Sequence, residues 1–310
     1  MEANGQPIGT PPGCTAKKGT GVTTGLCPFS TRHSTPLGCT AKEGTGVTVG
    51  YVPRVVGAGN LQPLPANGRR FSDTRRVRLD EAGPDGLLRL DALACHLQDV
   101  ATDDYLDAGF GDDRSWVLRR LLVVVHSPAG FDETITLTTW CSGLGSRWAE
   151  RSTQLRGTRG AQIDAAALWV HLDPATGIPH RLAGEFEEMF GPSAGGRRVG
   201  ATLLHPPPAN DDGSSSWVPR WCDLDVLGHV NNAAYWTAVL EAVATRRLQS
   251  PYRAEMEHRA AASAGQPLRT PVSVAADGTL QMWFVNEEGV CASGLVGPAG
   301  SESHREGERR

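Results

Sequence analysis

The sequence lacks both a long hydrophobic run and an excess of basic residues. Its strongest apolar stretch, from Leu121 to Val125, is short and flanked by Arg120 and His126, whereas a membrane-spanning helix needs about 20 apolar residues. Lysine and arginine number 30 against 34 aspartates and glutamates, which gives a formal net charge of -4. We therefore expect no membrane insertion and no nucleic acid partner, because phosphate binding favours a basic surplus.

Cofactor signatures are missing as well. The seven cysteines form no Cys-x-x-Cys pair and have no histidine spacing suited to zinc, so we expect free thiols in a reducing compartment. Neither Gly-x-x-x-x-Gly-Lys-Ser/Thr nor a strand-borne Gly-x-Gly-x-x-Gly occurs. We expect catalysis without a metal, nucleotide or flavin. The N-terminus has no basic segment leading into an apolar one, so we expect a cytoplasmic location.

Residues 1–70 are poor in large apolar side chains and contain a repeat. The segment from Thr10 to Val22 returns, nearly unchanged, from Thr35 to Val47. Two copies are too few for a solenoid, and the Gly-, Thr- and Pro-rich composition predicts a disordered extension. Two alternatives stay open: an organelle transit segment, which would place the chain in a plastid, and translated upstream sequence.

From Phe71 onward the sequence alternates between periodic apolar segments and turn residues, a pattern typical of folded secondary structure. We expect a strand over 71–79 and a helix over 88–106, where apolar residues recur at helical spacing. Four strands, rich in β-branched and aromatic residues, are expected over 116–126, 133–141, 147–155 and 163–172. A short helical piece follows at 185–190.

The same order then begins again after a Gly-, Pro- and Ser-rich stretch at 191–216, which predicts a linker. A strand is expected over 217–222, a helix over 232–248, and strands over 253–260, 272–275, 280–285 and 290–296. Residues 298–310 are polar and predict a disordered tail. The chain thus divides into two β-α-β4 units, at 71–190 and 217–297. Periodicity alone leaves open two unrelated α+β domains.

The most informative stretch, from Trp221 to Trp236, joins the predicted strand and helix of the second unit. Asp225 leaves the strand end, and His229 follows four residues later around a turn. Asn231 or Asn232 opens the helix, whose N-terminal amides can stabilise an oxyanion. A carboxylate, an imidazole and oriented donors suit acyl-group hydrolysis. Taken singly, each of these residues is also an ordinary turn, loop or capping residue.

The pattern Asp-x-Asp-x-x-Gly-His-x-Asn-Asn on a strand-to-helix turn resembles the signature of hotdog-fold thioesterases. With the helical segment 88–99 and the strands that begin near Trp116 and Thr139, it makes residues 71–296 similar to the acyl-ACP thioesterases of bacteria and plant plastids. The resemblance implies an α+β tandem hotdog fold, in which each unit is an antiparallel sheet wrapped around one long helix. It also implies hydrolysis of fatty acyl thioesters of acyl carrier protein, the expected partner.

The resemblance assigns catalytic positions to Asp225 and His229 and substrate-binding positions to Asn231 and Asn232. Asp225 would activate water or attack the thioester directly. His229 would orient the thioester or assist departure of the thiolate. Helix amides near the two asparagines would hold the developing oxyanion.

Two departures from the family pattern affect the expected mechanism. Leu227 stands where plant-type enzymes usually have Asn, and the stretch 259–262 reads Arg-Ala-Ala-Ala where they have a Glu-Cys pair. An Asp-centred mechanism is therefore favoured over a cysteine nucleophile. Glu257 and His258, on the strand after the motif helix, are weaker candidates, because strand alternation lets only one face the site.

The first unit has no equivalent motif, so we expect it to shape the acyl pocket. Candidate wall residues, each with core packing as its alternative, are Trp116, Leu118, Leu121, Trp140 and Trp148. Docking of an acidic carrier calls for a local cationic patch, with candidates Arg75, Arg76, Arg78, Arg119, Arg120, Arg246 and Arg247. An acyl-CoA thioesterase and a non-catalytic acyl-binding or accessory protein remain alternative functions. A homodimer and the acyl chain length are left open.

Overall fold

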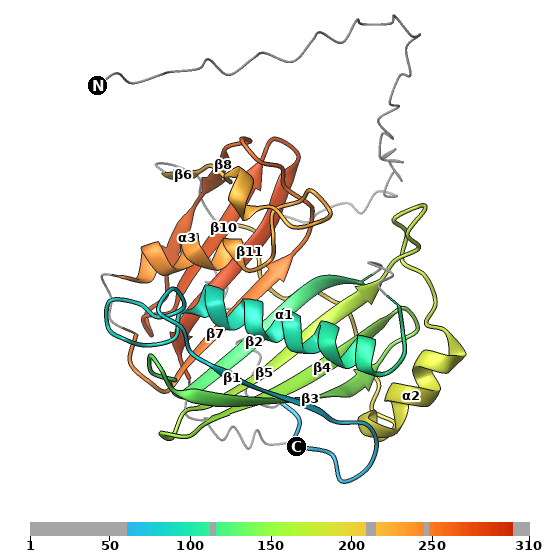
Figure 1. Cartoon of the computed structure of the whole chain (residues 1–310). Helices are drawn as coiled ribbons and strands as arrows, with labels where there is room; N and C mark the ends of the chain where they lie inside the picture. The colour runs from blue at the N-terminus through green and yellow to red at the C-terminus, as the bar shows by residue number, and fades with distance from the viewer. Residues whose placement is uncertain (1–60, 112–115, 209–214, 245–247, 300–310) are drawn as a thin grey trace, which may run out of the picture. The chain divides into compact units, whose positions relative to one another are not determined.

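The computed structural model describes residues 61–111, 116–208, 215–244 and 248–299 (Figure 1). The repeat-bearing segment, most of the C-terminal tail, Arg246 and Arg247 lie outside these residues. Residues 61–70 were expected to be disordered, yet Arg69 pairs with Asp104 at 2.6 Å and accepts a hydrogen bond from Ser193 through its carbonyl oxygen. Within the described ranges, no helix is long and apolar enough to cross a membrane.

The first half of the described chain has the expected order of one strand, one long helix and four strands. These elements are β1 (Phe71–Arg76), α1 (Leu90–Asp107), β2 (Trp116–Ser127), β3 (Thr134–Leu144), β4 (Trp148–Gly157) and β5 (Gln162–His171). The apolar stripe of α1 is buried, as its spacing predicts. Helix α2 (Gly184–Ala194) is longer than expected and packs against β3.

The second half is less regular than its sequence predicts. It contains β6 (Ser215–Trp217), the short 3-10 helix η2 (Trp221–Asp223), α3 (Ala234–Val243), β7 (Tyr252–His258), β8 (Leu268–Thr270), β9 (Val272–Val274), β10 (Leu280–Asn286) and β11 (Gly289–Pro298). The strand expected over 217–222 ends at Trp217. Pro219 cannot donate to a sheet ladder, and the Asp223 carboxylate accepts the Arg220 N–H at 2.7 Å, which closes a turn. The expected helix begins two residues late, at Ala234, and β8 was missed.

All these strands belong to one antiparallel sheet, whose order is β1-β3-β4-β5-β2-β7-β11-β10-β8-β6, with β9 beside β10. The two halves join where β2 pairs with β7. Helices α1 and α3 lie on the same face of this sheet (Figure 1) and contact one another. The main core lies between the helices and that face.

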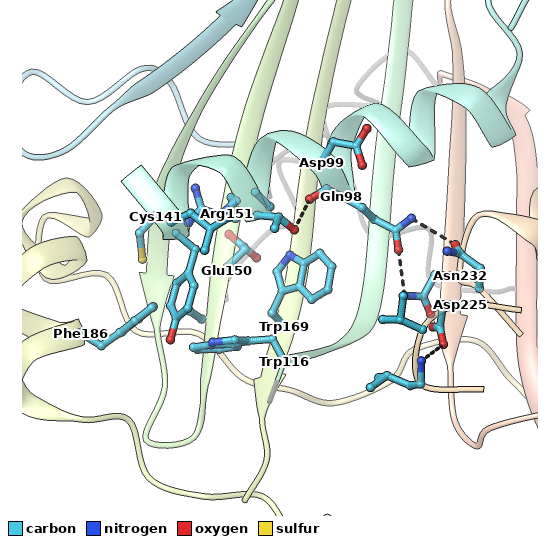
Figure 2. Close-up of a pocket in the computed structure, with 18 of the residues that line it drawn as sticks. Gln98, Asp99, Trp116, Cys141, Glu150, Arg151, Trp169, Phe186, Asp225 and Asn232 are labelled. Carbon is cyan, nitrogen blue, oxygen red and sulfur yellow. Dashed lines mark hydrogen bonds between the residues drawn. The ribbon is translucent and has the colours of Figure 1, made fainter. Parts of the chain in front are cut away.

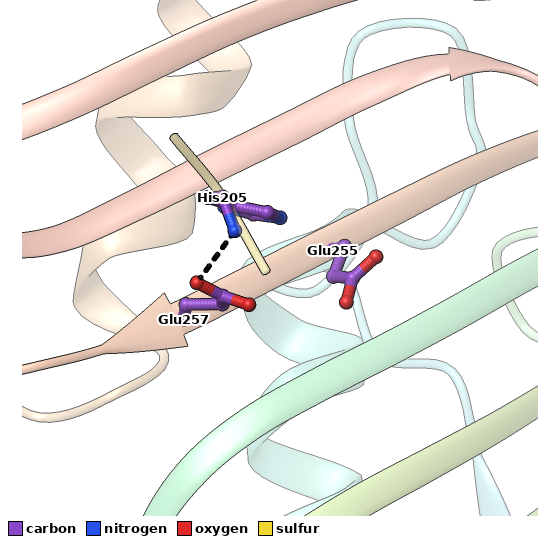
Figure 3. Close-up of side chains that lie close together, drawn as sticks. All are labelled: His205, Glu255 and Glu257. Atoms are coloured by element: carbon purple, nitrogen blue, oxygen red, sulfur yellow. Dashed lines mark hydrogen bonds between the residues drawn. The ribbon is translucent and has the colours of Figure 1, made fainter. Parts of the chain in front are cut away.

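The segment between the halves crosses the opposite face of the sheet and is held there by polar contacts. The Leu204 and His205 N–H groups both donate to the Glu257 carboxylate on β7, as Figure 3 shows for His205. The His205 Nδ1 atom lies 2.9 Å from the Ser293 hydroxyl on β11. Part of the predicted linker is thus fixed to the sheet.

Candidate active site

A cavity of about 650 Å³ runs along α1, and the motif loop reaches it. Asp225 and Asn232 lie at one end, Trp116 and Trp169 along the wall, and Phe186 at the other end (Figure 2). The remaining lining residues are Gln98, Asp99, Ala101, Thr102, Tyr105, Leu106, Gly111, Cys141, Ala149, Glu150, Arg151, Val226, Leu227 and Asn231. The first half supplies most of this wall.

Asp225 is held by the turn that it starts. Its N–H donates to the His229 carbonyl at 2.9 Å, and its Oδ1 accepts the Leu227 N–H at 2.9 Å. The turn is closed by Gly228, whose φ of 76° lies in the left-handed region that glycine adopts without strain. Among the residues that the structure describes, no group bonds to Oδ2 of Asp225. The carboxylate is thus oriented through one oxygen and has the other available for chemistry.

Three side-chain amides meet beside Asp225. Asn231 Oδ1 accepts the Ala233 N–H at 2.8 Å and the Gln98 Nε2 group at 3.2 Å. Gln98 Oε1 accepts Asn232 Nδ2 at 3.2 Å. Because a backbone N–H must face an oxygen, this contact fixes the orientation of Asn231 and, in turn, those of the other two amides. Each amide nitrogen uses one of its two hydrogens here, so Gln98 and Asn232 each retain a second N–H.

Three of the N–H groups at the start of α3, where the oxyanion donors were expected, already have partners. The Ala233 N–H is bound to Asn231 Oδ1, and the Ala234 N–H is bound to the Asn231 carbonyl at 2.9 Å. The Trp236 N–H donates to the Ala233 carbonyl. Asn231 occupies the first two of these donors, so the side-chain amides of Gln98 and Asn232 become further candidates for the oxyanion donors.

The two histidine candidates do not reach the cavity. His229 is exposed and is not among the lining residues. His258 points into the core, where its ring meets that of Tyr235 at 5.4 Å, and desolvation lowers its pKa to about 3. Glu257 faces the opposite side of the sheet, where it binds the crossing segment.

Of the five expected wall residues, only Trp116 lines the cavity. Leu118, Leu121 and Trp140 are buried elsewhere in the packing. Trp148 donates its indole N–H to the Val199 carbonyl of the crossing segment at 2.8 Å. Strand alternation explains why Trp140 does not line the cavity: its side chain shares a face of β3 with Ser142, whereas the neighbouring Cys141 lines the cavity.

Three of the five described candidates for the cationic patch, Arg75, Arg76 and Arg120, pair with carboxylates. Arg75 bonds three carboxylates, those of Asp73, Asp99 and Asp103, at 2.7 to 2.8 Å. Arg76 pairs with an aspartate, and Arg119 donates to backbone carbonyls. The carboxylates offset the charges of the paired arginines, whereas Arg78 and Arg119 have no carboxylate partner among the described residues and keep their charge for a carrier protein.

His205, Glu255 and Glu257 place potential metal-ligand atoms within 4.8 Å of one another. Their charges are already compensated: Glu255 pairs with Arg253 at 2.5 Å, and Glu257 pairs with Arg259 at 3.2 Å. A divalent cation would enter beside these guanidinium groups, which repel it. The cluster therefore serves to hold the crossing segment.

Comparisons with known proteins agree with the geometry. The family description "Acyl-ACP thioesterase N-terminal domain" matches residues 68–190, and "Acyl-ACP thioesterase C-terminal domain" matches residues 208–289. The chain is 28% identical over 207 residues to the palmitoyl-acyl carrier protein thioesterase of Gossypium hirsutum, covering 59% of this chain and 49% of that protein. An uncharacterized protein of Mycobacterium tuberculosis is 29% identical over 235 residues, which cover 75% of this chain and 93% of that protein.

Solved structures show the same fold. An acyl-ACP thioesterase from Bacteroides thetaiotaomicron aligns with a TM-score of 0.62 at 19% identity, over 74% of this chain and 97% of that one. The 12:0-ACP thioesterase from Umbellularia californica aligns with the same score at 22% identity and with the same coverage. The fold is the tandem hotdog of the thiolester hydrolases. The chain belongs to the acyl-ACP thioesterase family.

Proposed function

We propose that Asp225 is the catalytic carboxylate with which this thioesterase hydrolyses fatty acyl-ACP to a free fatty acid and ACP. The observation that carries the proposal is the shared cavity: Asp225 lines it together with Gln98 and Asn232, and a long apolar wall leads away from them. A base, hydrogen-bond donors and an acyl site are thereby adjacent.

In this mechanism the thioester carbonyl oxygen accepts hydrogen bonds from Gln98 Nε2 and Asn232 Nδ2. Asp225 removes a proton from water as the water oxygen attacks the carbonyl carbon. The tetrahedral intermediate collapses by breaking the C–S bond, which releases the carrier as a thiolate. Because thiols have pKa values near 8.5, the thiolate leaves readily. His229, four residues after Asp225, is exposed outside the cavity lining, and its proposed role is to assist the departing thiolate from the solvent side.

Direct attack by Asp225 is the second route. The carboxylate would form a mixed anhydride with the acyl group and expel the thiolate, and water would then hydrolyse the anhydride. In a single turnover in H₂¹⁸O, label in Asp225 identifies the anhydride route, whereas label only in the fatty acid also arises when water attacks the anhydride at its fatty acyl carbon. Water attack on the thioester carbonyl places ¹⁸O in the first fatty acid released, whereas anhydride hydrolysis at the aspartyl carbon places it in Asp225.

The test compares thiol release from matched acyl-ACP and acyl-CoA by the wild type, Asp225→Ala and Asp225→Asn. Asp277 provides the matched control, because it also accepts an N–H of its own turn at 2.9 Å, from Thr279, but lies outside the cavity. We expect both Asp225 variants to lose turnover by at least about 10²-fold and Asp277→Ala to retain it. Turnover unchanged in Asp225→Ala refutes the assignment. Binding without turnover by the wild type favours the accessory-protein alternative, and faster turnover of acyl-CoA favours the other carrier.

A further inference from the structure

The end of the cavity remote from Asp225 is closed by aromatic rings. The ring of Phe186 lies 5.1 Å from that of Trp116 and 6.5 Å from that of Tyr105, and the last two are 6.4 Å apart. Phe190 stands behind Phe186 at 4.7 Å. Rings at these separations are in contact, so an acyl chain that runs along the cavity cannot extend past them in that direction without displacing one.

Helix α2 supplies this barrier. Phe186 and Phe190 are buried in a small apolar cluster on α2, β3 and β4 that is separate from the main core. Cys141 and Ala149 belong to the same cluster and line the cavity. The cavity therefore ends against a packed wall, in which Phe186 is the large α2 side chain that reaches the cavity.

The charged residues that line the cavity near this end are paired, and the Glu150 carboxylate accepts a hydrogen bond from Arg197 at 2.5 Å. The Arg151 guanidinium bonds the Asp104 carboxylate and lies 5.5 Å from the centre of the Phe190 ring. Its hydrocarbon stem is left to face the cavity. Burial raises the pKa of the Cys141 thiol to about 11, so this group is neutral. The cavity end suits a methyl terminus.

The length of the cavity along α1 limits the chain. Gln98, beside the thioester site, and Tyr105, at the aromatic wall, both line the cavity and are seven residues apart on the helix, a rise of about 10 Å. An extended alkyl chain with C–C bonds of about 1.5 Å advances about 1.25 Å per carbon. The distance therefore holds about eight carbons beyond the carbonyl.

We propose that Phe186 is the specificity-determining residue that restricts this enzyme to medium-length acyl chains of about eight to ten carbons. The inference rests on the proposed function, since it places the acyl group of that reaction in this cavity. The inference extends the proposed function by naming the length of the acyl chain and the side chain that limits this length.

The experiment measures kcat/KM for saturated acyl-ACP of eight to eighteen carbons. We expect the wild type to peak near eight to ten carbons, and Phe186→Ala to shift the peak by at least two carbons, with a gain of about tenfold or more on the longer chain. Phe186→Leu, which keeps more of the packing, should shift it in the same direction. Ala149→Leu should shift it toward shorter chains. The half-exposed Phe131, which does not line the cavity, gives the matched control Phe131→Ala.

A binding measurement separates failure of this inference from failure of the proposed function. Calorimetry with non-hydrolysable S-alkyl pantetheine thioethers of the same lengths measures how the binding affinity depends on chain length, even if no thioester is cleaved. A medium-chain optimum that moves with Phe186 supports the inference, whatever the turnover. An optimum at sixteen to eighteen carbons, or a profile unchanged in both correctly folded Phe186 variants, overturns it.

Discussion

Gln98 and Asn231 are 133 positions apart in the sequence, yet their side-chain amides meet at 3.2 Å beside the proposed catalytic carboxylate. Gln98 comes from the helix of the first half, and Asn231 from the loop that starts the helix of the second half. The site is therefore completed across the two halves. The half without the Asp-Gly-His turn contributes a hydrogen-bonding group as well as the cavity wall.

Replacement of Gln98 by Ala should lower kcat by about 10²-fold, because it removes a proposed donor to the developing oxyanion. KM should change much less, since the cavity wall is retained. Gln98→Glu should behave similarly, because it places a carboxylate oxygen against Asn231 Oδ1. Steady-state kinetics on acyl-ACP checks both variants. The matched control is Gln154→Ala on β4, outside the cavity. A loss confined to KM would contradict the oxyanion role.

The predicted role of His229 can be separated from that of Asp225 by changing the leaving group. If His229 assists the departing thiolate, His229→Ala should impair hydrolysis of an alkyl thioester but be nearly neutral on an aryl thioester, whose thiol is more acidic. Asp225→Ala should impair both, because water still requires a base. Parallel assays of the two thioester types measure this difference. Equal impairment of His229→Ala on both substrates would instead favour a role in orienting the thioester.

How far the site could be predicted depended on how local its contacts are. Asp225, Asn231 and Asn232 lie in one short turn, so their spacing alone indicated a common site, and the structure places all three on the cavity. Gln98 carried no such signal, because its partners come from the other half of the chain. The spacing also could not show that Asn231 binds the N–H groups of Ala233 and Ala234, a contact that makes side-chain amides candidates for the oxyanion donors.

Secondary structure could be predicted where the hydrophobic pattern is long and periodic. It was harder to predict where a single residue determines whether a strand continues. The strands of the first half follow their β-branched runs closely. The strand expected over 217–222 failed because Pro219 and the Asp223 turn interrupt it. Phe186 was not recognised as a cavity residue, because only the packing of α2 against β3 brings it there.

Asp104 should be the most sensitive charged residue of the first half. It is fully buried and accepts hydrogen bonds from both Arg69 and Arg151. Asp104→Ala leaves the buried Arg151 without its carboxylate, so we expect a loss of about 3–5 kcal/mol in the free energy of unfolding. Asp107, which pairs with Arg69 at 2.6 Å but is largely exposed, gives the control: Asp107→Ala should cost less than about 1 kcal/mol. Urea denaturation compares the two, and similar losses would contradict the prediction.

Acidification should destabilise the fold through His258. Desolvation lowers the pKa of this imidazole, whose Nε2 atom is buried, to about 3, well below the value of about 6.5 expected in the unfolded chain. Between these values the unfolded chain binds a proton that the folded chain excludes, so the free energy of unfolding falls as the pH falls. From pH 7 to pH 5 this group alone contributes a loss of about 2 kcal/mol.

Replacement of His258 by Phe keeps an aromatic ring against Tyr235 and removes the titration. The variant should therefore lose less stability than the wild type between pH 7 and pH 5, by about 2 kcal/mol. Some pH dependence should remain, because desolvation also lowers the pKa of His205. The carboxyl groups of Asp223 and Glu133, whose pKa values are lowered, titrate below this window. Urea denaturation at both pH values, with the exposed His180→Gln as control, measures the difference. An unchanged slope in His258→Phe would show that this imidazole is protonated without disturbing the core.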